Sequence, residues 1–345
     1  MDPVVDKDCQ ENLPYAQHLS RYREVVVTGA NGMLGSYTVE ALCETSRLLG
    51  LCLPITAISR NFSSYLKKLS NHYQGILKLT NWHDLQSTVL NCHAPLIIHA
   101  ASPASPEKYS SDPIGLIETN IDATMVIAGA LSKTGGNCVF LSSGEVYGTT
   151  PDLPTSEDSY SPLDHLADRG IYGEAKRAGE LIFKSYSESH RFGATCLRVY
   201  HTFGPGIDLS QTRIFSTVVA ALIASRPIVL RSSGAAKRSF LYSADLFSAV
   251  LTSSQLSGFQ ALNVAGESEI SILDFASIAA GLSGGRCSVV VDEPKSDNHQ
   301  AKASESPIMR GLADTTRLKA LGWKQSVPID VAISRTTSSC RWRSL

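Results

Sequence analysis

Tyr172 and Lys176 are the residues whose types and spacing point most directly to chemistry. They lie four positions apart in a helix-periodic segment, so a phenol and an ammonium would share one helix face. A phenol takes a proton from an alcohol near neutral pH only if its pKa falls by roughly three units from about 10, a preference of about 4 kcal/mol for the phenolate. One exposed charge does not supply that much, so the pair predicts a partly dry site with a second positive charge near Tyr172.

A serine lies where it could orient the same alcohol. The segment from Leu141 to Gly148 reads LSSGEVYG after a β-rich run, which places Ser142, Ser143 and Glu145 at the carboxyl edge of a strand, where open α/β sheets bind ligands. Ser143 would hydrogen-bond the substrate hydroxyl and fix its position. A nucleophilic serine is not indicated, because the chain has no G-x-S-x-G elbow and no spacing that selects a histidine partner.

A glycine-rich turn provides a place for a dinucleotide. The strand-like run Val25–Thr28 leads directly into GANGMLG and then into a helical pattern. In that context Gly29 makes the tight turn, Gly32 lets the backbone approach a pyrophosphate, and Gly35 lets helix and strand pack closely. Unpaired N–H groups at the helix start favour phosphate. The oxidised nicotinamide ring of such a cofactor would carry the second positive charge that Tyr172 needs.

The end of the second strand leaves the choice between NAD and NADP open. Enzymes that use NAD usually carry Asp or Glu there to bond the ribose hydroxyls, whereas this chain reads ISRN from Ile58 to Asn61. Arg60 could face a 2′-phosphate or stack on adenine, and it could equally be a solvated residue at a strand end. The sequence therefore predicts NAD, with NADP as an alternative.

Alternating strand and helix patterns predict the frame that positions these groups. Such alternation is typical of βαβ units around a parallel sheet. The expected strands are Glu24–Thr28, Ile55–Ser59, Gly75–Leu79, Leu96–His99, Cys138–Ser142 and Ala194–Tyr200, and the expected helices are Leu34–Leu48, Asp112–Lys133 and Ile171–His190. The predicted fold class is α/β, a Rossmann-type doubly wound parallel sheet with a smaller C-terminal substrate-binding lobe.

The pattern divides the chain into three parts. Residues 1–22 are expected to form an N-terminal extension, residues 23–200 the dinucleotide-binding domain, and residues 201–345 mainly the second lobe. Within that lobe the segment 240–265 is expected to return to the sheet, near Phe240–Asp245. Two polar stretches, 149–169 and 292–307, are expected to be long loops, which in compact enzymes often serve as lids or binding loops.

Composition argues against several other classes of protein. The 345 residues carry 31 Lys and Arg against 32 Asp and Glu, so no basic excess is available to neutralise nucleic-acid phosphates. The first residues lack the basic start and apolar run of a signal peptide, and no uncharged apolar stretch reaches membrane-spanning length, which predicts a cytoplasmic protein without membrane contact. Eight cysteines and nine histidines show no metal-ligand spacing, so no metal is expected.

These motifs together resemble the nucleotide-sugar epimerase/dehydratase family of extended short-chain dehydrogenases, over nearly the whole chain. The nearest pattern is that of UDP-glucuronate decarboxylase-like members. The segments that carry the resemblance are TGANGMLG from Thr28, HAASPASP from His99 with Tyr109 following, SSGEVYG with the Tyr172 pair, RVYHTFGP from Arg198, KRSF from Lys237 with Tyr242 and Asp245, and DTTRLKALGW from Asp314. The resemblance implies an enzyme that uses NAD to oxidise a nucleotide-activated sugar to a 4-keto intermediate, and a homodimer that pairs through two helices of the dinucleotide domain.

The resemblance also assigns roles position by position. Tyr172 would take the proton of the C4 hydroxyl with help from Lys176 and Ser143, and Glu145 would serve an additional proton transfer. The nucleotide sugar would be bound by Ser143, Glu145, His201, Arg213, Arg231, Arg238 and Arg310. The cofactor would be bound by Gly29, Asn31, Gly32, Met33, Leu34, Gly35, Arg60, Ala100, Ala101, Ser102, Ser142, Tyr172, Lys176 and Tyr200.

Three positions depart from the family pattern. Relatives commonly have Asn at the position of His201 and often an aromatic residue at that of Arg231. Gly144 stands where decarboxylase-like members have Ser and dehydratase-like members have Asp, so the general acid that elimination of a C6 hydroxyl requires is missing.

Decarboxylation needs less from the protein, because a β-keto acid loses CO2 once its carboxylate is oriented. Arg310 falls where decarboxylase-like relatives contact that carboxylate. The sequence favours a UDP-glucuronate decarboxylase-like reaction. The alternatives are a 4-epimerase, a 4,6-dehydratase or a 4-keto reductase, and, from another class, a catalytically silent regulatory protein that binds a dinucleotide.

Overall fold

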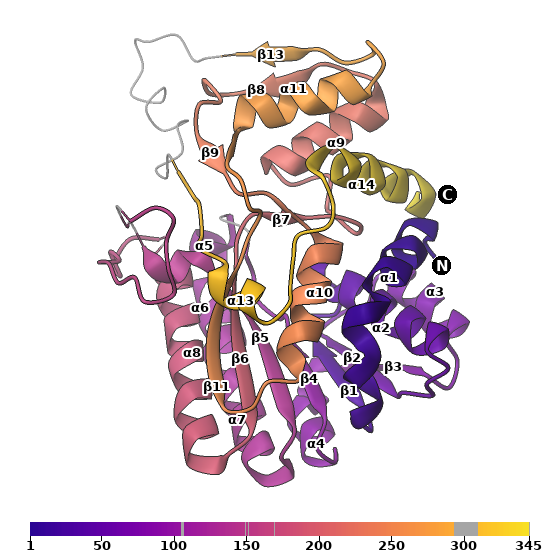
Figure 1. Cartoon of the computed structure of the whole chain (residues 1–345), viewed down its shortest axis with the longest axis vertical. Coiled ribbons are helices and arrows are strands. Elements are labelled where there is room, and N and C mark those ends of the chain that lie inside the picture. The colour runs from indigo at the N-terminus through magenta and orange to yellow at the C-terminus, as the bar shows by residue number, and fades with distance from the viewer. Residues whose placement is uncertain (105–106, 149, 151, 169, 293–309, 345) are drawn as a thin grey trace.

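A seven-stranded parallel sheet is the frame of the molecule, in a computed structural model that describes residues 1–344 apart from 105–106, 149, 151, 169 and 293–309 (Figure 1). The strand order is β11-β6-β5-β4-β1-β2-β3. The strand bounds are β1 Val25–Thr28, β2 Ile55–Ser59, β3 Leu77–Asn81, β4 Leu96–His99, β5 Asn137–Ser143, β6 Gly193–Val199 and β11 Phe259–Val264. The order reverses between β1 and β4, the switch point at which such sheets bind ligands, so the predicted fold class is confirmed.

The sheet strands lie where the sequence predicts them, within one or two residues. β1 and β4 are buried at every position, as parallel strands covered on both faces must be. The largest difference is at β3, which begins two residues later than expected. The turn after the preceding helix takes up Gly75 and Ile76, because the Ile76 amide donates to the Tyr73 carbonyl at 3.0 Å.

Helices cover both faces of the sheet, and alternate strand residues point into two separate cores. In β1, Val25 and Val27 belong to one core and Val26 to the other, as the two-residue period of a strand dictates. The helices of the first core are α1 Pro3–Ala16, α2 Met33–Leu48, α3 Ser64–His72 and α10 Ser243–Ser254, and those of the second are α4 Leu85–Leu90, α7 Ala123–Thr134 and α8 Gly170–His190. Short 3₁₀ turns lie at Gln17–Arg21, Trp82–Asp84 and Gly144–Tyr147.

The helix expected over Asp112–Lys133 consists of three parts. α6, Pro113–Ile117, passes through a π-helical turn, Glu118–Asp122, into α7. By length and composition alone the segment Pro113–Thr134 could cross a membrane. It packs against α4 and α8, however, and 44 % of its most apolar stretch is buried in the molecule, as in a core helix that passes the same test.

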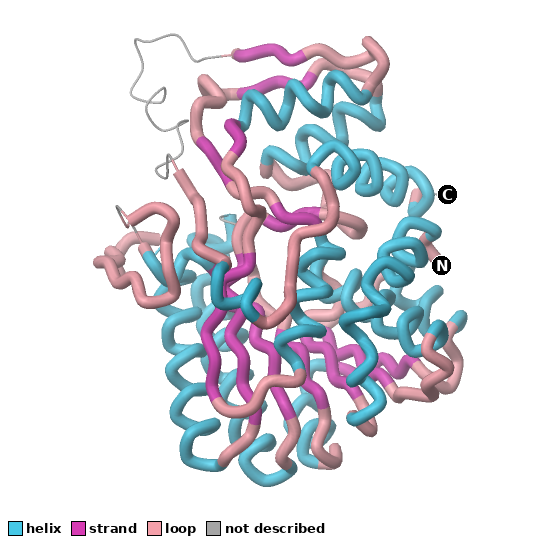
Figure 2. Tube along the Cα trace, viewed as in Figure 1, coloured by secondary structure: helices cyan, strands magenta, loops and turns pink. Residues whose placement is uncertain are grey.

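The second lobe lies above the carboxyl ends of the strands and contains helices that pack on one another with short strand pairs (Figure 2). Its elements are β7 Thr202–Phe203, α9 Ile214–Ala224, β8 Ile228–Leu230, β9 Lys237–Arg238, β10 Leu241–Tyr242, β12 Ile270–Ser271, α11 Ile272–Leu282, β13 Val289–Val291 and α14 Ile329–Arg343. The return to the main sheet occurs at β11 and not at Phe240–Asp245, because that segment forms β10, which pairs with β7, and then the start of α10.

Two further segments lie beside the sheet edge. α13, Thr316–Ala320, packs against β11, and α5, Glu107–Ser111, packs against α6. The described part of the expected loop 149–169 makes a β-bridge from Thr155 to Ala313, with the Thr155 amide donating to Leu312 at 2.9 Å. The expected loop 292–307 lies almost wholly outside the described residues.

The N-terminal segment is an integral part of the fold rather than a separate extension. α1 packs against α2, α10 and α14. Its Asp8 is fully buried and accepts hydrogen bonds from the hydroxyls of Tyr37 and Tyr242, both at 2.9 Å, and it pairs with Arg335 of α14 at 2.6 Å. Asp8 thus connects the first helix of the chain to the last.

Asp8 should make stability depend on pH. Burial raises its pKa to about 7, although Tyr242, Tyr37 and Arg335 lower it in part. The folded chain therefore holds a proton that the unfolded chain, with an Asp pKa of 3.8, has released, so stability falls as pH rises from about 4 to about 7. We expect Asp8→Asn to remove most of that fall, at most about 4 kcal/mol for roughly three pKa units. Urea unfolding across this pH range measures it, and parallel losses in both proteins would contradict the assignment.

Candidate active site

Tyr172 and Lys176 occupy the first two turns of α8 and share a face, as their spacing predicts. Both are buried, with 7 % and 1 % of their surface exposed. The Lys176 ammonium donates to the Leu141 carbonyl at 2.7 Å, and its Nζ lies 4.4 Å from the ring centroid of Phe140 and 5.8 Å from that of Tyr172. The helix thereby holds the phenol above the end of β5.

The Tyr172 phenol is surrounded by groups from four segments. Burial raises its pKa, and the charge of Glu145 adds to that effect, whereas the neighbouring hydroxyls of Ser143 and Ser102 and the charge of Arg213 lower it. The fall in pKa that general-base chemistry requires is therefore not a property of the protein alone. The arrangement brings Ser143 and Glu145 to the phenol, as the sequence predicts. It adds Arg213, assigned from the sequence to the nucleotide sugar, and Ser102, assigned to the cofactor.

Lys176 also differs from a simple permanent ammonium. Burial lowers its pKa to about 7, an effect that the charge of Glu180 partly offsets. His99 is fully buried nearby, stacks on Phe140 with centroids 5.2 Å apart, and has a pKa lowered to about 3 by burial and by Lys176. His99 therefore stays neutral, and burial brings the pKa of Lys176 close to neutral pH.

The glycine turn has the geometry that a dinucleotide requires. Gly29 has φ +69°, and a Cβ there would lie 2.5 Å from the Ala101 Cα, while a Cβ on Gly35 would lie 2.1 Å from the Gly29 oxygen. Gly32 is the N-cap of α2 and provides no side-chain cap, so the N–H groups of the first turn remain available to phosphate. The residues present therefore fit a dinucleotide.

Family comparison agrees with this geometry. Residues 25–265 match the profile of the NAD dependent epimerase/dehydratase family. The chain belongs to this family. Since its members are NAD-dependent enzymes that modify nucleotide sugars, the chain is assigned as an enzyme of that kind.

Individual relatives of the NAD dependent epimerase/dehydratase family match most of this chain, and the solved structures share its fold. UDP-glucuronic acid decarboxylase 1 of Xenopus tropicalis is 26 % identical over 319 residues, which cover 91 % of this chain and 71 % of the relative. UDP-N-acetylglucosamine 4-epimerase of Methanobrevibacter ruminantium, solved with UDP-N-acetylmuramic acid, has a TM-score of 0.78 at 23 % identity and covers 93 % and 99 % of the two chains. UDP-glucose 4-epimerase of Thermotoga maritima, solved with UDP-glucose, has a TM-score of 0.77 at 19 % identity, with 93 % and 100 % covered.

The other residues that the sequence assigns to the cofactor lie in different settings. Asn31 accepts the Ser63 amide at 2.9 Å and so ties the glycine turn to the loop after β2. Arg60 is exposed at the end of β2. Ser142 donates to Glu180 at 2.5 Å, so its hydroxyl proton is committed to the protein rather than free for the cofactor. Met33 and Leu34 begin α2, and Ala100 and Ala101 follow β4 beside Gly29.

The predicted substrate residues fall into two groups. Arg213, at the N-cap of α9, donates to the Ala104 carbonyl and lies near Tyr172. His201 and the buried Arg238 lie together, since a Cβ on Gly311 would be 3.6 Å from one and 3.9 Å from the other. Arg310 directly precedes Gly311 in the chain, and the Gly311 amide donates to Glu269 at 3.2 Å. Arg231 is exposed, and Arg310 is held by Glu269 at 2.5 Å.

Several contributors were missed by sequence reasoning. Tyr109 stacks on Tyr172, with centroids 5.2 Å apart and planes at 14°. Glu180 pairs with Arg198 at 2.7 Å and fixes Ser142, and its position four residues after Lys176 was the available signal. Glu269, the partner of Arg310, is far away in sequence and gave no local signal.

Among the described residues, no group of three His, Cys, Asp or Glu side chains could hold a metal.

Tyr200 occupies the space beside Gly144. A Cβ on Gly144 would lie 2.7 Å from both Cε2 and Cζ of the Tyr200 ring. Burial raises the pKa of the Tyr200 phenol, so it is neutral in the working range. The two residues are therefore complementary in size, and any side chain at position 144 requires the Tyr200 ring or the backbone to shift.

Gly144→Ala should disrupt this pair. We expect it to lower the free energy of unfolding by about 1–3 kcal/mol, because the ring or the backbone must shift. Gly129→Ala in α7 is the matched control, since a Cβ there meets nothing within 4 Å, and it should be neutral or raise stability by up to about 1 kcal/mol. In the Tyr200→Ala background the Gly144→Ala penalty should largely vanish. Denaturant unfolding of the four variants measures this, and an unchanged penalty would refute the coupling.

Proposed function

We propose that the protein is a UDP-glucuronate decarboxylase-like enzyme that acts through a 4-keto sugar. The observation that carries the proposal is the buried Tyr172 phenol, with Ser143 and Glu145 beside it, at the carboxyl edge of a sheet whose first turn fits a dinucleotide. Curated relatives named UDP-glucuronic acid decarboxylases, 23 to 26 % identical, support this choice of reaction.

The residues would divide the work as follows. Ser143 orients the C4 hydroxyl, and Tyr172 accepts its proton as the C4–H bond breaks. NAD, which the Gly29–Gly35 turn would hold, would supply the hydride acceptor for C4 and a positive charge that favours the phenolate. With a ketone at C4, the C5–C6 bond of the acid breaks, CO2 leaves, and the electron pair moves to the C4 oxygen. Glu145 lies where it can serve the proton that C5 then gains.

A 4-epimerase is the second candidate, and a specific contact favours it. Arg310, which would hold the substrate carboxylate in a decarboxylase, is already paired with Glu269, and its side chain is 52 % exposed. A glucuronate carboxylate would have to compete with that pair. An epimerase does not need Arg310, because the 4-keto sugar only rotates in the site before it is reduced on its opposite face.

We also propose that the cofactor is NAD rather than NADP. The family is NAD-dependent, and Arg60 lies exposed just after the end of β2. Because no acidic residue lies at the end of β2 to bond the ribose hydroxyls, NADP remains the alternative cofactor, and the affinities for NAD and NADP should be compared.

Substrate turnover distinguishes these candidates. Purified protein with NAD should release CO2 from UDP-glucuronate, and Tyr172→Phe should retain NAD but lose about 10²–10⁴-fold of the rate. Gas analysis and nuclear magnetic resonance of the products measure both. If UDP-glucuronate is unchanged while UDP-glucose or UDP-N-acetylglucosamine is epimerised, the decarboxylase assignment is wrong. If NAD binds and no sugar reacts, the protein is a silent binder.

We propose that two copies pair through α6, α7 and α8. Apolar side chains are exposed on each of these helices: Ile114 by 70 %, Met125 by 43 % and Leu181 by 63 %. We expect a dimer in sedimentation experiments and a monomer for Leu181→Glu, because a buried unpaired charge would oppose pairing. Leu166→Glu is the control, since Leu166 is 85 % exposed but precedes α8. A monomeric parent protein would refute the proposal.

A further inference from the structure

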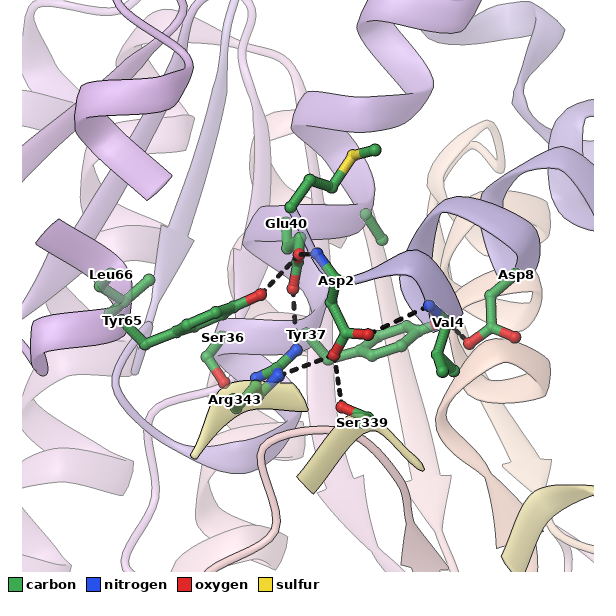
Figure 3. A network of polar contacts seen from close by, with 12 residues as sticks. Asp2, Val4, Asp8, Ser36, Tyr37, Glu40, Tyr65, Leu66, Ser339 and Arg343 are labelled. Atoms are coloured by element: carbon green, nitrogen blue, oxygen red, sulfur yellow. Dashed lines mark hydrogen bonds and ion pairs between the residues drawn. The ribbon is translucent and has the colours of Figure 1, made fainter. Parts of the chain in front are cut away.

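Arg343, in the last turn of α14, joins segments that are far apart in the sequence (Figure 3). Its Nε pairs with Asp2 at 2.9 Å and its Nη2 with Glu40 of α2 at 2.8 Å. The guanidinium carbon lies 4.1 Å from the ring centroid of Tyr65 in α3. The Arg343 side chain is 12 % exposed, and both carboxylates are fully buried.

The two carboxylates depend on this arginine for neutralisation. Glu40 also accepts hydrogen bonds from the Tyr65 hydroxyl at 2.6 Å and the Asp2 amide at 2.9 Å, and Asp2 accepts from Ser339. All of these donors are uncharged. In the described part of the chain, Arg343 is the one basic side chain paired with Asp2 and Glu40.

The cluster formed by Arg343, Asp2 and Glu40 lies one helix segment away from the glycine turn. Glu40 follows the first residue of α2, Met33, by seven positions, which is about 10 Å along a helix that rises 1.5 Å per residue. A Cβ on Gly206 would lie 3.0 Å from Ser36 Oγ, in the start of α2, and 3.1 Å from Arg343 Nη1. Gly206 therefore lies against both the Arg343 guanidinium and the first turn of α2, where the phosphate would bind.

A second connection runs through α3. Tyr65, under the guanidinium, is in the first turn of α3, whose N-cap is Ser63. The Ser63 amide donates to Asn31 of the glycine turn at 2.9 Å. Arg343 thus supports both α2 and the segment after β2 that borders the adenosine end of a dinucleotide in this fold.

We infer that Arg343 is a positioning residue for the dinucleotide: it neutralises Glu40 and Asp2 behind the start of α2 and holds α3 against that helix. The inference rests on the proposed dinucleotide site at the glycine turn. Without the guanidinium, a buried carboxylate about 10 Å from the helix start would oppose the partial positive charge there and repel the pyrophosphate, in an interior that screens weakly.

The test compares two arginines of α14 by NAD binding. Arg335 is the matched control: its side chain is 13 % exposed, and its ion-pair partners, Asp8 and Glu11, lie in α1 rather than in α2 or α3. In titration calorimetry we expect Arg343→Met to raise the Kd for NAD about tenfold, or about 1.4 kcal/mol. We expect Arg335→Met to leave the Kd within about twofold at a similar loss of Tm.

A rescue separates charge from general loosening. Arg343→Met/Glu40→Gln, which removes the unpaired charge, should recover most of the NAD affinity. Wild-type affinity in Arg343→Met, equal weakening in Arg335→Met, or no rescue would overturn the inference. If Arg343→Met does not fold, Arg343→Lys with one ion pair should still weaken binding about threefold, and an unchanged Kd there overturns it. Failure of the parent protein to bind NAD would instead refute the dinucleotide site.

Discussion

The burial of Lys176 between α8 and β5 is the constraint on which the candidate site depends. Its ammonium keeps one fixed acceptor, the Leu141 carbonyl, and lies against the Phe140 ring, so little solvation offsets the cost of its charge. The same dry environment raises the pKa of Tyr172. In this environment neither group alone has a pKa suited to proton transfer. Positive charge from a bound cofactor would lower the pKa of Tyr172, and the phenolate would in turn favour the ammonium of Lys176.

Arginine–carboxylate pairs connect the parts of this fold that the sheet does not. Arg198 with Glu180 links β6 to α8, Arg335 with Asp8 links the last helix to the first, and Arg343 with Glu40 links the last helix to α2. Buried pairs of this kind add little net stability, since desolvation offsets the attraction, but a misdocked partner leaves a charge unpaired. These ion pairs therefore specify where α1 and α14 pack. The packing of these two helices in turn fixes the position of the second lobe against the dinucleotide domain.

The parts of the structure that are local in sequence could be predicted, and the parts made by distant partners could not. The continuous apolar runs of β1 and β4 predict strands that are buried on both faces, and the 3.6-residue periodicity of α8 predicts a helix. The spacing of the glycines in Gly29–Gly35 predicts a turn. The 1–22 segment gave no such signal, because α1 buries Asp8 and Asn12, whose partners lie in α2, α10 and α14. The partners of Ser142 and Arg310 were missed for the same reason.

The Gly144–Tyr200 pair shows how one such distant contact bears on the reaction. A side chain at position 144 would project toward the place that the Tyr200 ring fills, so a general acid there would require this ring or the backbone to shift. Elimination at C6 needs that acid, whereas epimerisation and decarboxylation do not. The identity of Gly144 alone indicates that a dehydratase-type acid is missing. The structure adds a steric reason, the ring of Tyr200, which directly follows β6. Among the remaining reactions, decarboxylation would require a substrate carboxylate to compete with Glu269 for the guanidinium of Arg310.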